Sequence, residues 1–272
     1  LSRVLAGPWC TQLLADLGAT VIKIEKPGSG DDTRAWGPPF LKDASGRDTS
    51  EAAYYLSCNR GKLSVAVDFT TPDGQRIVRD LLRQADVLVE NYKVGGLEKY
   101  GLDYPAVATA NPRLVYASIT GFGQSGPYAD HAGYDFIIQG MSGFMSVTGE
   151  RDALPGGGPQ KAGIAITDLM TGMYTTVAIQ AALAHRDRTG QGQWIDTKHA
   201  DAYDDLVNSG HAASYCYGCH TVTAYANSAA VAPDSSSLDP FTEFEPAAMS
   251  RASYDVAEVI ERRRTRFQDL LL

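Results

Sequence analysis

The stretch KLSVAVDFTTPDGQRIVRDLLRQADVLVEN, residues 62–91, indicates the fold class. Two short runs rich in β-branched residues, 62–69 and 86–91, enclose a segment in which Pro72 comes early and Ile77 and Leu81 recur at helical spacing. Short apolar strands joined by a helix form a βαβ unit. The two strands of such a unit are parallel, and the helix covers one face of the sheet.

The same alternation continues on both sides of this unit. Strands are predicted at residues 20–25, 113–120 and 192–198, and helices at 11–19, at 103–111 and from 168 onward. Right-handed crossovers between such strands give a doubly wound fold. We therefore predict an α/β domain over residues 1–204, with a Rossmann-like parallel sheet and helices on both faces.

Both ends of the chain differ from this pattern. The opening LSRVLAGPWC has neither an initiator Met nor the plan of a signal peptide, so we expect a domain whose first residues are missing. Residues 205–272 are expected to form a linker or tail, which is loop-like at first and ends in an amphipathic helix within 254–271.

Composition narrows the class of partner. The 272 residues are 44% hydrophobic and carry a net charge of −8, which does not favour nucleic acid or an anionic membrane as the main partner. No apolar run reaches about 18 residues, so a membrane span is not expected. Four scattered cysteines do not form a secreted disulfide framework. We expect a reducing compartment: the cytoplasm or, in a eukaryote, the mitochondrial matrix or the peroxisome.

Three short motifs have alternative explanations. GFGQSG, residues 121–126, satisfies a dinucleotide fingerprint, but Pro127 follows at once where a helix should begin, so a tight loop at a strand end is favoured. CYGCH, residues 216–220, matches haem attachment or half of a zinc site, but chance spacing explains it better. PGGGPQ, residues 155–160, lacks the Lys-Ser/Thr pair of a phosphate loop and fits a flexible connector. We predict no metal site.

KAGIAITDLMTGMY, residues 161–174, contains one carboxylate, Asp168, where a strand-like run becomes helical. An acidic residue at a helix start is usually an N-cap. The same position favours an ionised carboxylate, which can attack a thioester. These residues alone leave both roles open. The helix should bury one apolar or small face, made of Leu169, Gly172, Met173, Thr176, Val177, Ala181 and Ala184.

Five blocks of the chain resemble the class III CoA-transferases in order and spacing, over roughly residues 1–200. The blocks are RVLAGPWCTQLLADLGATVIKIEKPGSGDDTRAWGPPF (3–40), YYLSCNRGKLSVAVD (54–68), DVLVENYKVGGLEKYGLDY (86–104), LVYASITGFGQSGPYADHAGYD (114–135) and GIAITDLMTGMY (163–174). The resemblance implies that Asp168 is the nucleophile, which receives an acyl group from acyl-CoA and then forms an aspartyl-CoA thioester. It also implies an interlocked homodimer and a small domain, which this chain largely lacks, so we expect its activity and dimerisation to be in question.

The resemblance also implies which residues contact CoA, here a substrate rather than a tightly bound cofactor. They are Arg34, Arg60, Lys62, Asn91, Tyr92, Lys93 and Tyr134. For the cations, composition alone would favour a solvated surface.

Tyr134 bears on the choice between reactions. Racemases of the same fold carry a His at the position of Tyr134, and a phenol is a poor general base at neutral pH. The sequence thus favours transfer of CoA to a small carboxylic acid. The alternatives are a racemase, a dinucleotide oxidoreductase using GFGQSG, or a non-catalytic CoA-binding fragment.

Overall fold

The computed structural model of the chain describes residues 1–151, 153–199 and 221–226. Its elements in chain order are α1 (Ala6–Asp16), β1 (Ile22–Glu25), η1 (Asp32–Ala35), β2 (Phe40–Lys42), β3 (Asp48–Ala52), α2 (Ala53–Ser57), β4 (Leu63–Ala66), α3 (Pro72–Leu82), β5 (Val87–Glu90), η2 (Glu98–Tyr100), α4 (Tyr104–Ala110), β6 (Val115–Thr120), α5 (Asp135–Met141), η3 (Phe144–Val147), α6 (Ile166–Thr189), β7 (Gln193–Lys198) and β8 (Thr221–Ala226). The strands predicted within the first two hundred residues all form. The hairpin β2–β3 and the helices α2 and α5 are additions to the prediction.

Parallel pairing is confirmed, but in two separate groups. The main sheet has the order β5-β6-β7-β8, in which the first three strands are parallel and β8 is antiparallel to β7. Strands β1 and β4 form their own parallel pair, and β2 and β3 form an antiparallel pair. β8 lies in the stretch predicted to be a linker or tail.

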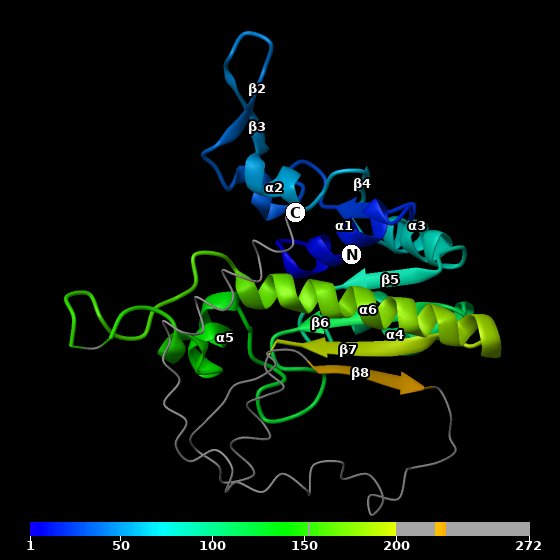
Figure 1. Ribbon diagram of the computed structural model, residues 1–272. Coiled ribbons are helices and arrows are strands. Elements are labelled where there is room, and N and C mark those ends of the chain that lie inside the picture. The colour runs from blue at the N-terminus through cyan, green and yellow to red at the C-terminus, as the bar shows by residue number, and fades with distance from the viewer. Residues whose placement is uncertain (152, 200–220, 227–272) are drawn as a thin grey trace, which may run out of the picture. The chain divides into compact units, whose positions relative to one another are not determined.

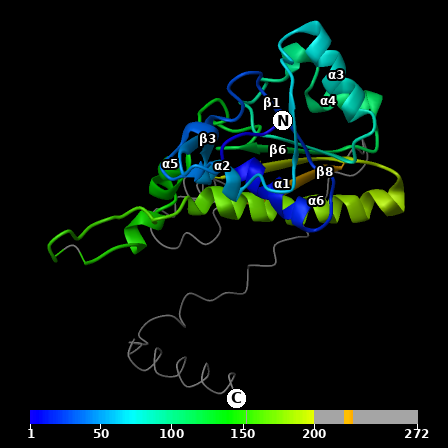
Figure 2. The ribbon, with the colours of Figure 1, turned by 90° about the horizontal axis from the view of Figure 1, so that it is seen from above.

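Helices cover both faces of the main sheet, as predicted. Figure 2 shows α1 and α6 on one side of β6, and α3 and α4 on the other. Alternate residues of each strand face opposite layers: on β5, Leu88 packs with α3 and α4, whereas Val89 packs with α1 and α6. On β6, Tyr116 and Val115 divide in the same way.

The long helix α6 buries Gly172 and Thr176 as predicted, but most of its buried face is a different one. Its buried side chains include Thr171, Thr175 and Ile179, whereas Met173 and Val177 are exposed. The threonine hydroxyls donate to carbonyls one turn earlier, which lets these side chains pack as β-branched apolar groups. Gly172 fixes this face, because a Cβ there would lie 2.7 Å from the Ala6 carbonyl oxygen of α1. Figure 1 shows α6 lying along β6 and β7.

Two predictions fall outside the described residues. These are the CYGCH motif and the amphipathic helix of the tail, so the division at residue 204 stays a prediction. In the part of the chain that the structure describes, no helix has both the length and the apolar character needed to cross a bilayer.

Candidate active site

A cavity of about 520 Å³ lies where the parallel strands end. Asn91, Tyr92 and Lys93 follow β5, Gly121 follows β6 and His199 follows β7, and all of them line this cavity. The carboxyl edge of a parallel sheet is the usual ligand site of an open α/β fold. The volume lies within the range of small-molecule pockets.

Asp168 opens into the same cavity and is not the cap of its helix. Helix α6 begins at Ile166, its N-cap is Ala165, and Asp168 occupies the third helical position. The capping role left open for Asp168 belongs instead to Asp135 of α5, whose Oδ1 accepts from the Thr167 backbone N–H at 2.8 Å and from its hydroxyl at 2.7 Å.

The side chain of Asp168 is therefore available to the cavity. It keeps 18% of its surface exposed, so the carboxylate is neither sealed in the core nor fully solvated. Its position in the first turn of α6 favours negative charge, because the positive end of the helix dipole lies there.

One close neighbour of Asp168 is His199, which sequence reasoning did not include. His199 Nε2 lies 3.1 Å from Asp168 Oδ1, and His199 Nδ1 lies 2.6 Å from the Thr120 carbonyl oxygen. The ring is almost fully buried. The strand 192–198 was predicted, and the residue just past a parallel strand is a natural site position, so this signal was present in the sequence.

Another neighbour, Tyr54 of α2, responds to the charge of this site. Burial raises the pKa of Tyr54 to about 12, and the negative charge of Asp168 contributes in the same direction. Tyr54 is therefore a neutral phenol near the carboxylate and can act only as a hydrogen-bonding group at physiological pH.

The cavity wall also carries positive charge and aromatic rings. Arg3, Lys93 and Lys99 line it. Of these three, only Lys93, which follows the end of β5, was predicted from the sequence to contact CoA. Phe69, which also lines the cavity, packs edge-to-face on Tyr92 with ring centroids 5.8 Å apart. Cations beside aromatic rings suit a ligand that combines phosphates with a heterocycle.

Asn91 positions one side of the cavity. Its Oδ1 accepts from the Arg3 N–H at 2.9 Å, and its Nδ2 donates to the Arg3 carbonyl at 2.7 Å. Val4, which follows Arg3, has a φ of 68°, a left-handed conformation that is costly for a β-branched side chain. Asn91 thus holds a strained segment that lines the site.

Tyr134 lines the cavity from its rim. It is the N-cap residue of α5, and 64% of its surface is exposed. Its neighbour in the wall, His131, packs its ring against Tyr128 with centroids 5.5 Å apart.

Three residues predicted to contact CoA do not line this cavity. Arg34 donates to Glu51 at 2.6 Å and to Glu25 and Tyr55, each at 2.6 Å. Arg60 forms a surface ion pair with Asp16. Their roles toward CoA stay predictions.

Lys62 is the third of these residues and is surrounded by acceptors. Its ammonium group donates to Pro8 O, Cys58 O, Thr11 Oγ1 and Asn59 Oδ1 at 2.7–3.1 Å. Burial and then the charge of Lys23 lower the pKa of Lys62 to about 7, although these four acceptors surround it.

The loop 121–126 does not open a helix, which removes the dinucleotide alternative. The next helix after Gly126 is α5, and it begins only at Asp135. The N–H groups of Gly123 and Gln124 already donate to Thr120 Oγ1 and Asp196 Oδ2, each at 2.9 Å. Gly121 serves a close approach of two chain segments, since a Cβ there would collide with the Gly133 backbone.

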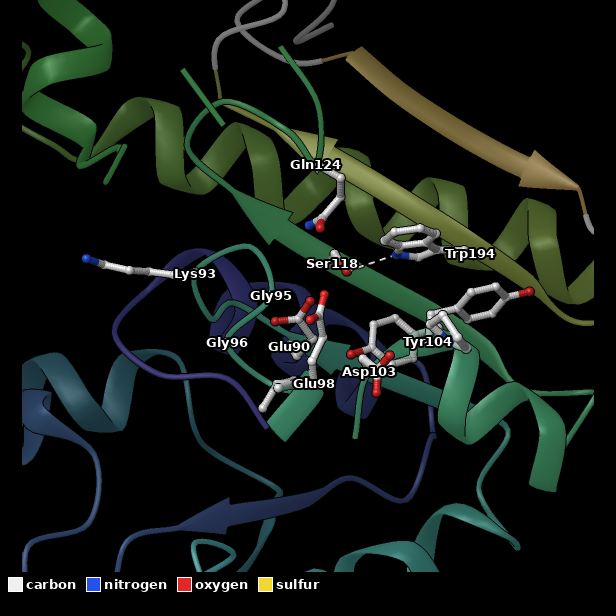
Figure 3. Close-up of a pocket in the computed structure, with 13 residues that line it drawn as sticks. Glu90, Lys93, Gly95, Gly96, Glu98, Asp103, Tyr104, Ser118, Gln124 and Trp194 are labelled. Atoms are coloured by element: carbon white, nitrogen blue, oxygen red, sulfur yellow. Dashed lines mark hydrogen bonds between the residues drawn. The ribbon is translucent and has the colours of Figure 1, made fainter. Parts of the chain in front are cut away.

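A smaller pocket of about 120 Å³ lies beside β5, β6 and β7 and is acidic (Figure 3). Glu90, Glu98 and Asp103 line it, and the Trp194 indole donates to Ser118 Oγ at 3.0 Å. Lys93 extends away from these carboxylates in Figure 3. The carboxylates of the smaller pocket would repel phosphates, so the larger cavity is the better site for an anionic ligand.

Comparison with known proteins agrees with this geometry. The profile of CoA-transferase family III matches residues 1–231. The chain belongs to this family. It is 61% identical over 207 residues to the succinate–glutarate CoA-transferase of Agrobacterium fabrum, which covers 76% of this chain and 50% of that protein. It is 50% identical over 196 residues to the succinyl-CoA:glutarate CoA-transferase of Mus musculus, covering 72% and 42%.

A solved structure supports the fold. The crystal structure of a CaiB/BaiF family protein from Brucella suis aligns with a TM-score of 0.69 at 54% identity, over 77% of this chain and 54% of that one. The chain spans about half the length of these curated relatives. The family resemblance and the α/β fold class are thereby confirmed.

Proposed function

We propose that this chain carries the nucleophile and a CoA-binding wall of a CoA-transferase, which moves CoA from an acyl-CoA thioester to a carboxylic acid. The observation that carries the proposal is that Asp168 faces a 520 Å³ cavity while Asp135 performs the capping role. A carboxylate relieved of capping, beside an open volume, is suited to covalent catalysis.

The proposed reaction proceeds through exchanges on one carboxylate. Asp168 attacks the thioester carbon, a C–O bond forms, the C–S bond breaks, and CoA thiolate leaves. The thiolate attacks the aspartyl carbonyl of the mixed anhydride and releases the donor's carboxylate, which leaves an aspartyl-CoA thioester. The acceptor carboxylate then takes the aspartyl group from sulfur, and the thiolate attacks the acceptor's carbonyl, which regenerates Asp168 without net proton transfer.

CoA binding is proposed for the part of the predicted set that lines the cavity. Lys93, together with Arg3 and Lys99, supplies charge for the phosphates, and Tyr92 supplies an aromatic surface. Asn91 acts by holding the Arg3 segment, and Tyr134 lies at the rim near the acyl end.

For the acids, the relatives' names are the guide. Two of them are named for succinyl-CoA or succinate together with glutarate. We propose that dicarboxylates are the acids to test first, with succinyl-CoA as donor and glutarate as acceptor.

Geometry supports transfer over racemisation. A racemase needs two bases on opposite sides of the substrate α-carbon. At the position where racemases of this fold carry a His, this chain has Tyr134, whose phenol is a poor general base at neutral pH. Asp168 and His199 lie 3.1 Å apart, which leaves no room for a carbon between them either. Deuterium incorporation at the α-carbon without any acceptor acid would support racemisation and contradict this reasoning.

A second copy of the chain is proposed as the protein partner. Phe136 and Ile137 on α5, and Met173 and Val177 on α6, are exposed. Exposed apolar side chains on neighbouring helices are typical of interaction surfaces. Sedimentation equilibrium of the chain should give a dimer mass, and a monomer at all concentrations would contradict the proposal.

Mass spectrometry tests the covalent route. The chain is incubated with succinyl-CoA without acceptor and then treated with hydroxylamine. Hydroxamate on the Asp168 peptide, absent in Asp168→Asn, is the expected result. A folded sample that binds CoA but forms no adduct would contradict the proposed function.

A further inference from the structure

His199 is fixed in place by contacts on two sides. Its backbone N–H donates to the carbonyl oxygens of Thr120 and Gly121 at 3.2 and 3.1 Å, and its ring Nδ1 lies 2.6 Å from the same Thr120 oxygen. These contacts leave ring Nε2 directed at Asp168 Oδ1, 3.1 Å away. The ring therefore joins the end of β6 to the carboxylate on α6.

The two acceptors that face the ring indicate its protonation when Asp168 is ionised. A carbonyl oxygen only accepts hydrogen bonds, and so does an ionised carboxylate. Nδ1 must therefore donate to Thr120, and Nε2 must donate to Asp168. A neutral imidazole carries one proton and would leave a lone pair facing an acceptor in one of these two contacts. The contacts fit an imidazolium beside an ionised Asp168.

We propose that His199 is a catalytic residue whose Nε2–H stabilises the oxyanion that develops on Asp168 Oδ1 during formation of the aspartyl-CoA thioester. This inference rests on the proposed function. Asp168 Oδ2 makes the bond to the acyl carbon, so Oδ1 becomes the carbonyl oxygen of the mixed anhydride. When the CoA thiolate attacks the aspartyl carbon, the C=O electron pair moves onto Oδ1.

A cationic hydrogen-bond donor that is already in place stabilises this oxyanion more than solvent water does. Removal of one oxyanion donor typically lowers a rate by about 10²- to 10³-fold. As the tetrahedral intermediate collapses, the carboxylate of the acyl donor leaves and the electron pair returns to the C=O bond. His199 therefore keeps its proton throughout. The His199 ring donates a hydrogen bond but does not transfer its proton.

Several ionisable groups share this environment. Tyr54 is a neutral phenol that responds to the Asp168 charge. Asp135 lies at the same helix start, and the cavity wall adds His131 and Tyr134. The cations that line the cavity are Arg3, Lys93 and Lys99. Asp168 is the carboxylate in direct contact with the His199 ring among the described residues.

The first measurement is the protonation of the ring, which needs no activity. Long-range ¹H–¹⁵N NMR at pH 7 should give both His199 nitrogens the shifts of protonated nitrogen, with the signal assigned by its loss in His199→Gln. In Asp168→Asn, Nε2 should lose its proton because a neutral amide can donate to it. An unprotonated Nε2 in the unsubstituted chain would overturn the inference.

The second measurement is the rate at which the CoA adduct forms on Asp168 after mixing with succinyl-CoA, followed by quenched-flow and intact mass. His199→Leu should slow adduct formation about 10²-fold. His199→Gln, which keeps a neutral donor, should recover part of this loss. His185→Gln is the matched control, because His185 lies seventeen residues or about 25 Å further along the same helix and should leave the rate unchanged.

The outcomes separate the two proposals. Adduct formation at an unchanged rate in His199→Leu would overturn the role of His199 and leave the proposed function standing. No adduct in the unsubstituted chain would contradict the proposed function and remove the catalytic role, and the NMR result would still decide whether the charged pair exists.

Discussion

Within residues 23–62, Lys23 and Arg34 form ion pairs with nearby carboxylates, whereas Lys93 and Lys99 line the Asp168 cavity. Lys23 donates to Asp31 at 2.7 Å, and Arg34 is shared between two glutamates. Arg3 lines the cavity as well but also pairs with Asp32. The residue types are the same in both regions. The difference lies in whether protein acceptors already occupy the donors.

Asp168→Asn should give the largest effect and test the cavity side of this contrast. The substitution keeps the size of the side chain but removes the nucleophile, so the transfer rate should fall by roughly 10⁴-fold. The midpoint of thermal unfolding should change little, because Asp168 is not the cap and the Asn amide can donate to a neutral His199 ring in place of the charged contact. Steady-state kinetics and calorimetry measure the two quantities. A variant that retains a tenth of the activity would show that Asp168 does not carry the reaction.

The sequence could predict the sheet, but not which carboxylate at its edge caps α6 and which faces the cavity. Strand and helix periods over residues 62–91 are local, and the structure reproduces them. The capping of α6 by Asp135 is not local, because it joins residues 32 positions apart. Local propensity left the capping role of Asp168 open, since it could not detect a competing carboxylate from α5.

The predicted face of α6 was only partly right, for a related reason. Helical periodicity treated Met173 and Val177 as core and gave threonines a minor place. In the structure Thr171 and Thr175 are buried because their hydroxyls bond within the helix, and Gly172 sets the approach of α1. The same limit affects Arg34 and Lys62, whose acceptors come from several segments.

Glu90, a buried carboxylate at the end of β5 that lines the smaller acidic pocket, extends the comparison to a third environment. Burial raises its pKa from 4.5 to about 7, although Ser118 and the Tyr92 N–H donate to it. Between these pH values the folded chain binds more protons than the unfolded chain, so the free energy of unfolding should fall as pH rises from about 4.5 to about 7. The decline should be at most about 3 kcal/mol.

Glu90→Gln should remove this decline, because the amide keeps an acceptor for Tyr92 but has no charge to bury. Urea unfolding at pH 5 and pH 8 measures the difference. Equal pH dependence in both proteins would mean that Glu90 is solvated and belongs with the open cavity.

Lys62→Met and Lys93→Met form a matched pair, one from each region. Loss of Lys62 leaves Thr11 and Asn59 without this donor, so the chain should lose about 2 kcal/mol of stability. Lys93→Met should leave stability nearly unchanged and weaken CoA binding by about 5- to 10-fold, with a smaller salt dependence. Calorimetric titration and urea unfolding give both values. If Lys62→Met weakened CoA binding and Lys93→Met lowered stability, the contrast drawn between the two regions would be wrong.

Arg60→Gln should give the smallest effect and decides between two roles for one side chain. Arg60 and Asp16 form an exposed pair, and such pairs contribute at most about 1 kcal/mol, less at high salt. Because Asp16 holds the guanidinium on α1, outside the cavity, CoA affinity should stay within about twofold. If the sequence-based role is right, CoA should bind several-fold more weakly to the variant. Dephospho-CoA would then show whether the 3′-phosphate is the group recognised, since its affinity would not respond to the substitution.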